Sequence, residues 1–129
     1  PLCQIAFYPI KGAYGEVYVD GCKYDNNPHP VLVLNPQFFN KGLYFMVEVM
    51  IHEMVHVYCH VTKQKDINYK NGYHNKVFKV VCESIGLKCK KGTCGYNTTY
   101  LSAELKDKVA KIVEENDLVK VLSKYNYDI

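Results

Sequence analysis

The longest regular hydrophobic pattern in the chain covers residues 43–61 and contains neither glycine nor proline. Its apolar residues recur at intervals of three and four, as expected of a helix that packs one face against a sheet. The residues assigned to that face are Val47, Met50, Ile51, Met54, Val55, Tyr58 and Val61. The pattern therefore predicts one long helix over 43–61.

Three segments before this helix have the pattern of strands. Residues 3–10 are rich in apolar and aromatic side chains, and residues 16–20 alternate between apolar and polar positions. Residues 31–34 are continuously apolar, which suits a strand that is buried on both faces. Residues 25–30 are dense in Asn and Pro and are interpreted as a loop.

The remainder of the chain alternates between helical patterns and turns. The predicted elements are a short helix from Pro36, a polar loop over 63–72, a helix over 74–85, a hairpin that pairs 87–89 with 95–100, a helix capped by Ser102, a shorter helix after Asp117 and a loose end over 125–129. The predicted fold is α+β, with a small and mainly antiparallel sheet packed against the 43–61 helix and a following helix. A length of 129 residues indicates one domain spanning 1–129.

Composition narrows the range of functions. The net charge of +3 arises from 16 basic residues, all of them lysine, and 13 acidic ones. The lack of arginine counts against a dedicated nucleic-acid surface, and no apolar run is long enough to span a membrane. The six cysteines form no C-x-x-C pair, so free thiols and a cytoplasmic location are expected, although Cys89 and Cys94 flank a turn across which they could pair.

The long helical pattern contains H-E-x-x-H as His52, Glu53 and His56. The two histidines lie one turn apart on the same helix face, so both imidazoles can bind one zinc ion. Glu53 is then placed to accept a proton from a zinc-bound water. His60 continues the stripe but is excluded, because it lies about 12 Å along the helix from His52 while zinc–nitrogen bonds are about 2 Å.

A catalytic zinc site normally has three protein ligands and a water, so a third ligand is needed from elsewhere. His74 is the favoured candidate, because the loop that ends near Gly72 can bring it back over the first helix. Glu83 is the main alternative, since some metallopeptidases take a Glu ligand from a following helix. Asp66 could serve as a ligand or simply cap its loop, and His29, between two prolines, is expected to face solvent.

Two further residues are candidates for supporting roles. Glu48 lies one turn before His52 and could accept the second N–H of that imidazole, or could be a solvated surface residue. Tyr73 adjoins His74 and is a candidate hydrogen-bond donor to an oxyanion, with a packing role as the alternative.

The segment 47–56 resembles the active helix of SprT-like zinc metallopeptidases, the family that includes the eukaryotic protease Spartan. In that family a Glu precedes the first histidine by four residues, as Glu48 does here. The downstream family element is matched by Gly72, His74, Phe78 and Lys79. The sequence departs from the family pattern by placing Tyr73 between glycine and histidine and Asn75 where a glycine is frequent, spellings similar to those of bacterial and phage-type members. The resemblance covers about residues 31–86.

The resemblance implies a zincin-like fold and a zinc-dependent endopeptidase with a single zinc ion. His52, His56 and His74 would bind this ion, and Glu53 would act as the base toward a protein or peptide substrate, including DNA-associated proteins as for some relatives. It also implies a helix upstream of Pro1, whereas the cysteine spacing gives no sign of the zinc ribbon that many members carry at the C-terminus. The alternative is a zinc-binding module with vestigial or no hydrolytic activity, and no membrane partner is expected.

Overall fold

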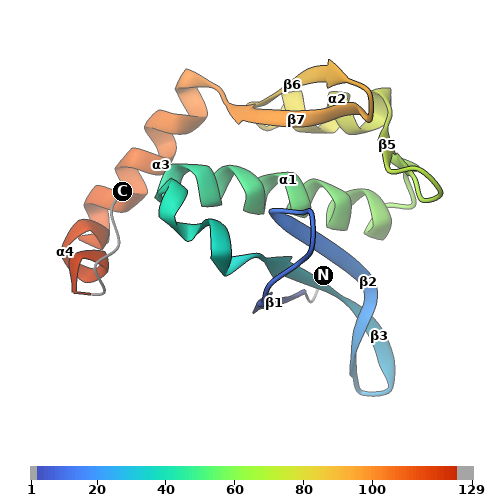
Figure 1. The fold of residues 1–129 in the computed structure, drawn as a ribbon, viewed down its shortest axis with the longest axis horizontal. Helices are drawn as coiled ribbons and strands as arrows, with labels where there is room; N and C mark the ends of the chain where they lie inside the picture. Colours follow the sequence, from blue (N-terminus) through green and yellow to red (C-terminus); the bar gives the residue numbers. More distant parts are fainter. Residues whose placement is uncertain (1–2, 125–129) are drawn as a thin grey trace.

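The predicted long helix lies at the centre of the fold (Figure 1). The computed structural model describes residues 3–124, and in it helix α1 (Leu43–Val61) contacts a three-stranded sheet on one side and elements of a four-stranded sheet on the other. The mixed α+β architecture is as predicted, but the single expected sheet is in fact two. No helix among the described residues is long and apolar enough to cross a membrane.

The first sheet consists of β1 (Gln4–Phe7), β2 (Gly15–Tyr24) and β3 (Asn27–Leu34), in the order β1-β3-β2. Strand β3 is parallel to β1 and antiparallel to β2. The apolar end of β3, residues 31–34, is buried as the sequence predicted. Its residues Leu32 and Leu34 pack against Met46 and Val49 of α1, which joins this sheet to the helix.

The segment 25–30 is not the loop that was predicted. Only Asp25 and Asn26 form the turn, and their positive φ angles of 50° and 64° suit a two-residue hairpin connection. Residues 27–30 extend β3, although two of them are prolines. The prolines are tolerated because β1 pairs only with residues 31–34, which leaves one edge of β3 free beside them.

A short 3₁₀ helix, η1 (Pro36–Lys41), connects β3 to α1, as the Asn35-Pro36 pair predicted. The Asn35 side chain accepts the backbone N–H of Gln37 and donates to the carbonyls of Ile10 and Ala13, at 2.9 and 3.0 Å. Asn35 is fully buried, so these hydrogen bonds anchor the 10–13 loop to the start of the helical region.

The second sheet and its helix carry the remaining part of the core. Its elements are β4 (Ile67–Asn68), β5 (Tyr73–His74), α2 (Lys76–Ser84), β6 (Leu87–Gly92) and β7 (Gly95–Leu101), with the strand order β4-β5-β7-β6. The predicted hairpin is confirmed. The helix predicted over 74–85 begins later, because the side chain of Asn75 caps it, and His74 belongs to a strand.

Helix α1 buries two faces rather than the single stripe that was predicted. Met54, Tyr58 and Val61 were expected in the core but are 51%, 52% and 42% exposed. On the side of the second sheet, the buried residues are Val55, Cys59, Phe78, Cys82 and Leu87. A helix between two sheets must be apolar on two opposite faces. The prediction assumed a single apolar face and therefore assigned exposed residues that lie between the two faces to the core.

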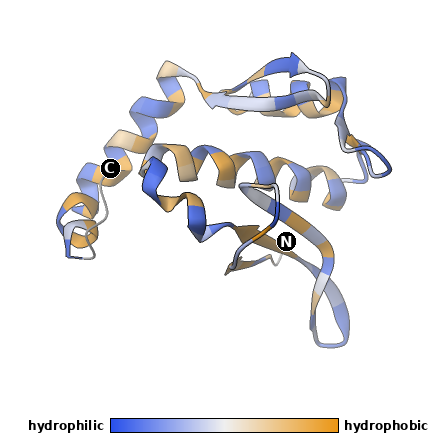
Figure 2. Ribbon diagram, viewed as in Figure 1, coloured by the Kyte–Doolittle hydropathy of each residue, from blue (hydrophilic) through white to orange (hydrophobic). Residues whose placement is uncertain are grey.

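The chain ends in α3 (Ala103–Glu115), capped by Ser102 as predicted, and α4 (Leu118–Ser123), which follows Asp117. These helices lead away from α1 (Figure 1), and their hydrophilic residues alternate with apolar ones along the ribbon (Figure 2). Residues 125–129 lie outside the described part of the chain. All six cysteines are free thiols, including Cys89 and Cys94.

Candidate metal centre

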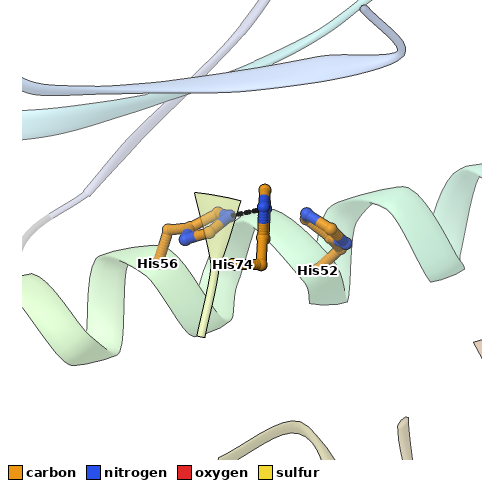
Figure 3. Close-up of side chains that lie close together, drawn as sticks. All are labelled: His52, His56 and His74. Atoms are coloured by element: carbon orange, nitrogen blue, oxygen red, sulfur yellow. Dashed lines mark hydrogen bonds between the residues drawn. The ribbon is translucent and has the colours of Figure 1, made fainter. Parts of the chain in front are cut away.

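Three histidine side chains converge beside α1 (Figure 3). His52 and His56 come from consecutive turns of that helix and His74 from β5. One ring nitrogen of each lies within 4.8 Å of those of the other two, and the Nε2 atoms of His56 and His74 are 3.1 Å apart. Two imidazole nitrogens on one tetrahedral zinc ion would be about 3.3 Å apart. The three rings therefore already have nearly the spacing that one ion requires.

The backbone of β5 and β7 fixes the position of His74. His74 pairs with Ile67 on one side and with Gly95 on the other, and its N–H donates to the carbonyl of Cys94 at 3.0 Å. Gly95 is buried with a φ of +71°, and a Cβ there would overlap the carbonyl of His74. Only glycine therefore allows β7 to approach closely enough to hold this histidine over α1.

Each imidazole is oriented by a hydrogen bond at Nδ1. His56 contacts Oδ2 of Asp66 at 2.6 Å, His74 donates to the carbonyl of Gly72 at 2.8 Å, and His52 contacts Oγ1 of Thr99 at 3.0 Å. The Nε2 atoms are thereby left facing one another, in the arrangement found at sites where histidines bind a metal.

Glu48 was a candidate to orient His52 or a solvated surface residue, and the structure shows it in neither role. The Glu48 carboxylate accepts the backbone N–H of Leu101 at 3.1 Å, and Thr99 takes the place at His52. Thr99 lies 47 residues from His52 and is brought there by the register of β7, for which the sequence carries no local signal. Asp66 was considered as a ligand, but its carboxylate contacts Nδ1 of His56 instead. The sequence signal for this role is an acidic residue between the H-E-x-x-H motif and the third histidine.

The other candidates weighed from the sequence lie away from the three histidines. Glu83 is exposed and pairs with Lys79 at 3.8 Å, and His60 is exposed at the end of α1. His29 lies on β3, with its ring centroid 6.3 Å from that of Tyr24. The structure thus brings His74, and not these groups, to the H-E-x-x-H motif.

Tyr73 does not reach the cleft in front of the histidines. It directly precedes His74 in β5, and neighbouring strand residues face opposite sides of a sheet. The tyrosines that do line this cleft are Tyr14 and Tyr69. The prediction of Tyr73 as the oxyanion donor is therefore not supported by its position.

Phe78 forms an apolar floor beneath the three rings. It is fully buried, and its centroid lies 4.9, 4.8 and 4.7 Å from those of His52, His56 and His74. Such packing excludes water from one side of the site and restricts rotation of the imidazoles.

Burial determines the protonation of these groups. Desolvation, together with repulsion by neighbouring His56, lowers the pKa of His52 well below its usual value and also lowers the pKa of His74. Both rings are therefore neutral at pH 7, the form in which histidine binds a metal ion.

Glu53 adjoins the histidines on the side of the first sheet. Burial raises the pKa of its carboxyl group to about 7, with a smaller increase from Glu16 and an opposing effect from His56. A Cβ at Gly15 would lie 3.1 Å from Cγ of Glu53, so the glycine allows β2 to pack closely against it. A pKa near 7 is well suited to a residue that both accepts and returns a proton.

The histidines and Glu53 open into a cleft of about 680 Å³. One wall contains residues 12–17 and Val19, and the opposite wall contains Ile67, Tyr69 and residues 97–99. The cleft lining includes three glutamates and no lysine, although the chain has 16 basic residues. The site therefore combines three nitrogen donors, a proton acceptor and room for a substrate.

Comparison with protein-family models supplies the relationship that the residues suggested. The model of the SprT-like family matches residues 19–94, more than half of the chain. The chain belongs to the SprT-like family. The matched segment of this SprT-like protein contains Glu53 and all three histidines, and it ends in the turn between β6 and β7. Comparisons with curated proteins and with solved structures found no match.

The contact between Asp66 and His56 leads to a test of metal affinity. Asp66→Asn keeps the shape of this buried side chain but removes its negative charge, so we expect zinc affinity to fall about 10–100-fold. Competition with a chromophoric chelator measures the change. Asp107→Asn, on the exposed face of α3, is the matched control, and equal affinities of the two variants would contradict a role of Asp66 in orienting His56.

Proposed function

We propose that this SprT-like protein is a zinc-dependent endopeptidase that cleaves extended protein segments. The observation that carries the proposal is the position of Glu53, with its pKa near 7, beside three imidazoles whose Nε2 atoms converge. Family membership supports the same function.

The donor set fits zinc. Three nitrogen ligands and one open position are typical of catalytic zinc sites, and the lowered pKa values of His52 and His74 keep these donors unprotonated. A zinc ion held there would polarise a substrate carbonyl and increase the acidity of a water molecule.

Glu53 would accept a proton and then deliver it in this reaction. As the water oxygen bonds to the carbonyl carbon, the Glu53 carboxylate accepts a water proton, and it then delivers this proton to the amide nitrogen as the C–N bond breaks. The products are one carboxyl and one amino terminus, and Glu53 returns to its starting state. Its burial favours the protonated intermediate form, because desolvation destabilises the carboxylate.

The edge of β2 supports an extended peptide as substrate. The carbonyl of Tyr14 accepts the N–H of Asn35 at 2.9 Å, so the alternate residues Gly15 and Val17 direct their backbone groups away from β3. No strand of the described residues pairs with this edge, and both residues line the cleft. An extended peptide can add to such an edge through backbone hydrogen bonds.

Cleavage of an unfolded protein by the zinc-loaded chain tests the proposal. We expect new termini within the unfolded substrate, detected by mass spectrometry, loss of cleavage on chelation and its return with added zinc. A folded protein of the same composition should remain intact, because its strands are already paired. Zinc binding without cleavage would contradict the proposed peptidase function and would favour the alternative, a zinc-binding module without hydrolytic activity.

A further inference from the structure

Tyr69 has an unusual combination of position and freedom. It lines the same cleft as the three histidines, yet its side chain is 73% exposed. Within residues 3–124 its hydroxyl group has no hydrogen-bond partner. The cleft therefore contains a phenolic donor that no other contact of the fold uses.

The loop that carries Tyr69 is anchored at both ends next to the candidate metal centre. Ile67 pairs with His74, and Asn68 accepts the N–H of Lys70 through its side chain and that of Gly72 through its carbonyl, at 3.0 and 2.7 Å. The backbone on either side of Tyr69 is thus fixed relative to a histidine of the site, while the exposed ring can turn about its side-chain bonds.

The surroundings of Tyr69 keep its hydroxyl group protonated. Partial burial and the negative charge of Asp66 raise the pKa of Tyr69, with a smaller contribution from Cys59. Asp66 contacts His56 at Nδ1, and Tyr69 and His56 both line the cleft. It can donate a hydrogen bond throughout the neutral pH range.

The other tyrosine of the cleft is held by aromatic contacts. The ring of Tyr14 packs edge-on against that of Phe45, with centroids 5.1 Å apart. Phe45 is seven residues before His52, which is about 10 Å along the helix. The Tyr14 ring is therefore held beside the first turn of α1.

We propose that Tyr69 is a catalytic residue whose hydroxyl group donates a hydrogen bond to the carbonyl oxygen of the scissile peptide as that oxygen becomes negative. The inference rests on the proposed peptidase function. As the water oxygen bonds to the carbonyl carbon, the π electron pair moves to the carbonyl oxygen, where Tyr69 stabilises the charge without losing its own proton. The pair re-forms the C=O bond when the C–N bond breaks. A hydrogen-bond donor at this atom lowers the barrier because it acts where charge develops.

Tyr69→Phe removes only the hydroxyl group. We expect kcat to fall about 100–1,000-fold, the loss typical of a single oxyanion donor, with KM and zinc affinity unchanged. Tyr73→Phe, in the adjoining strand β5 and outside the cleft lining, is the matched control and should retain full activity. Cleavage by Tyr69→Phe at the wild-type rate would overturn this inference alone, whereas lack of cleavage by the wild-type protein would overturn the proposed function with it.

A binding measurement separates catalysis from a structural role without turnover. In a Glu53→Gln background, the Tyr69→Phe change should weaken binding of a phosphinic peptide, which carries a negative tetrahedral oxygen, about 10–100-fold. Binding of the amide peptide of the same sequence should not change. Equal weakening of both peptides would show that Tyr69 only shapes the cleft and would overturn its catalytic assignment.

Discussion

Replacing Glu53 with glutamine is expected to stop peptide cleavage while zinc stays bound. The amide keeps the size of the side chain but cannot take up the water proton, and removal of a positioned base typically costs about 100–10,000-fold in rate. The ligands His52, His56 and His74 are unchanged, so metal analysis should give the same zinc content as for wild type. Glu104→Gln, on an exposed helix surface, is the control for the loss of a carboxylate. Equal activity of Glu53→Gln and wild type would contradict the proposed mechanism.

The same substitution, Glu53→Gln, is expected to stabilise the metal-free protein above neutral pH. The pKa of Glu53 is raised from 4.5 to about 7 in the folded state, so the folded chain binds this proton more tightly than the unfolded chain does. The resulting stability is present below pH 4.5 and is lost as the pH rises to about 7. At pH 8, Glu53→Gln should therefore be more stable than wild type by up to about 3 kcal/mol, with no difference from this source at pH 4. Urea unfolding at the two pH values measures this change.

Gly95→Ala is expected to disrupt the candidate metal centre by displacing His74. A side chain at this left-handed position costs about 1 kcal/mol by itself. Its Cβ would also overlap the backbone of His74, so β5 and β7 must separate and His74 must move. We expect a loss of more than about 3 kcal/mol in the free energy of unfolding and a large loss of zinc affinity.

Gly72→Ala is the matched control for this effect. Gly72 has the same φ of +71°, but a Cβ there would meet nothing within 4 Å. It should therefore show only the conformational cost of about 1 kcal/mol and retain zinc. Urea unfolding and chelator competition on both variants separate the backbone strain of a left-handed residue from the displacement of His74. Equal losses of stability and of zinc affinity in the two variants would contradict a specific role of the β5–β7 contact.

The features that the sequence predicted well are those with a strong local pattern. The bounds of α1 agree with the prediction because no glycine or proline interrupts residues 43–61. The hairpin of β6 and β7 and the caps at Asn35 and Ser102 also have local signals, in turn residues and side-chain acceptors.

The features that escaped prediction depend on contacts between distant segments. Strands β4 and β5 have two residues each, too few for any periodicity, yet they place His74. Thr99 reaches His52 only through the register of a hairpin that is remote in the sequence, and register is set by tertiary packing. The extension of the predicted hairpin by β4 and β5 into a second sheet was missed for the same reason, and with it the fact that α1 has two buried sides.

The two sheets on either side of α1 contribute different parts of the candidate site. The side-chain groups that hold the imidazoles, Asp66, Phe78 and Thr99, follow α1 in sequence, whereas the strand edge proposed to bind a peptide precedes it. The family match begins at residue 19 and so omits most of the peptide-side wall formed by 12–17. Under the proposed function, substitutions in that wall are expected to change peptide preference and to leave zinc affinity intact, provided Gly15 is kept beside Glu53. Under the proposed peptidase function, substrate preference is therefore expected to depend on residues 12–17 more than on the elements that hold the imidazoles.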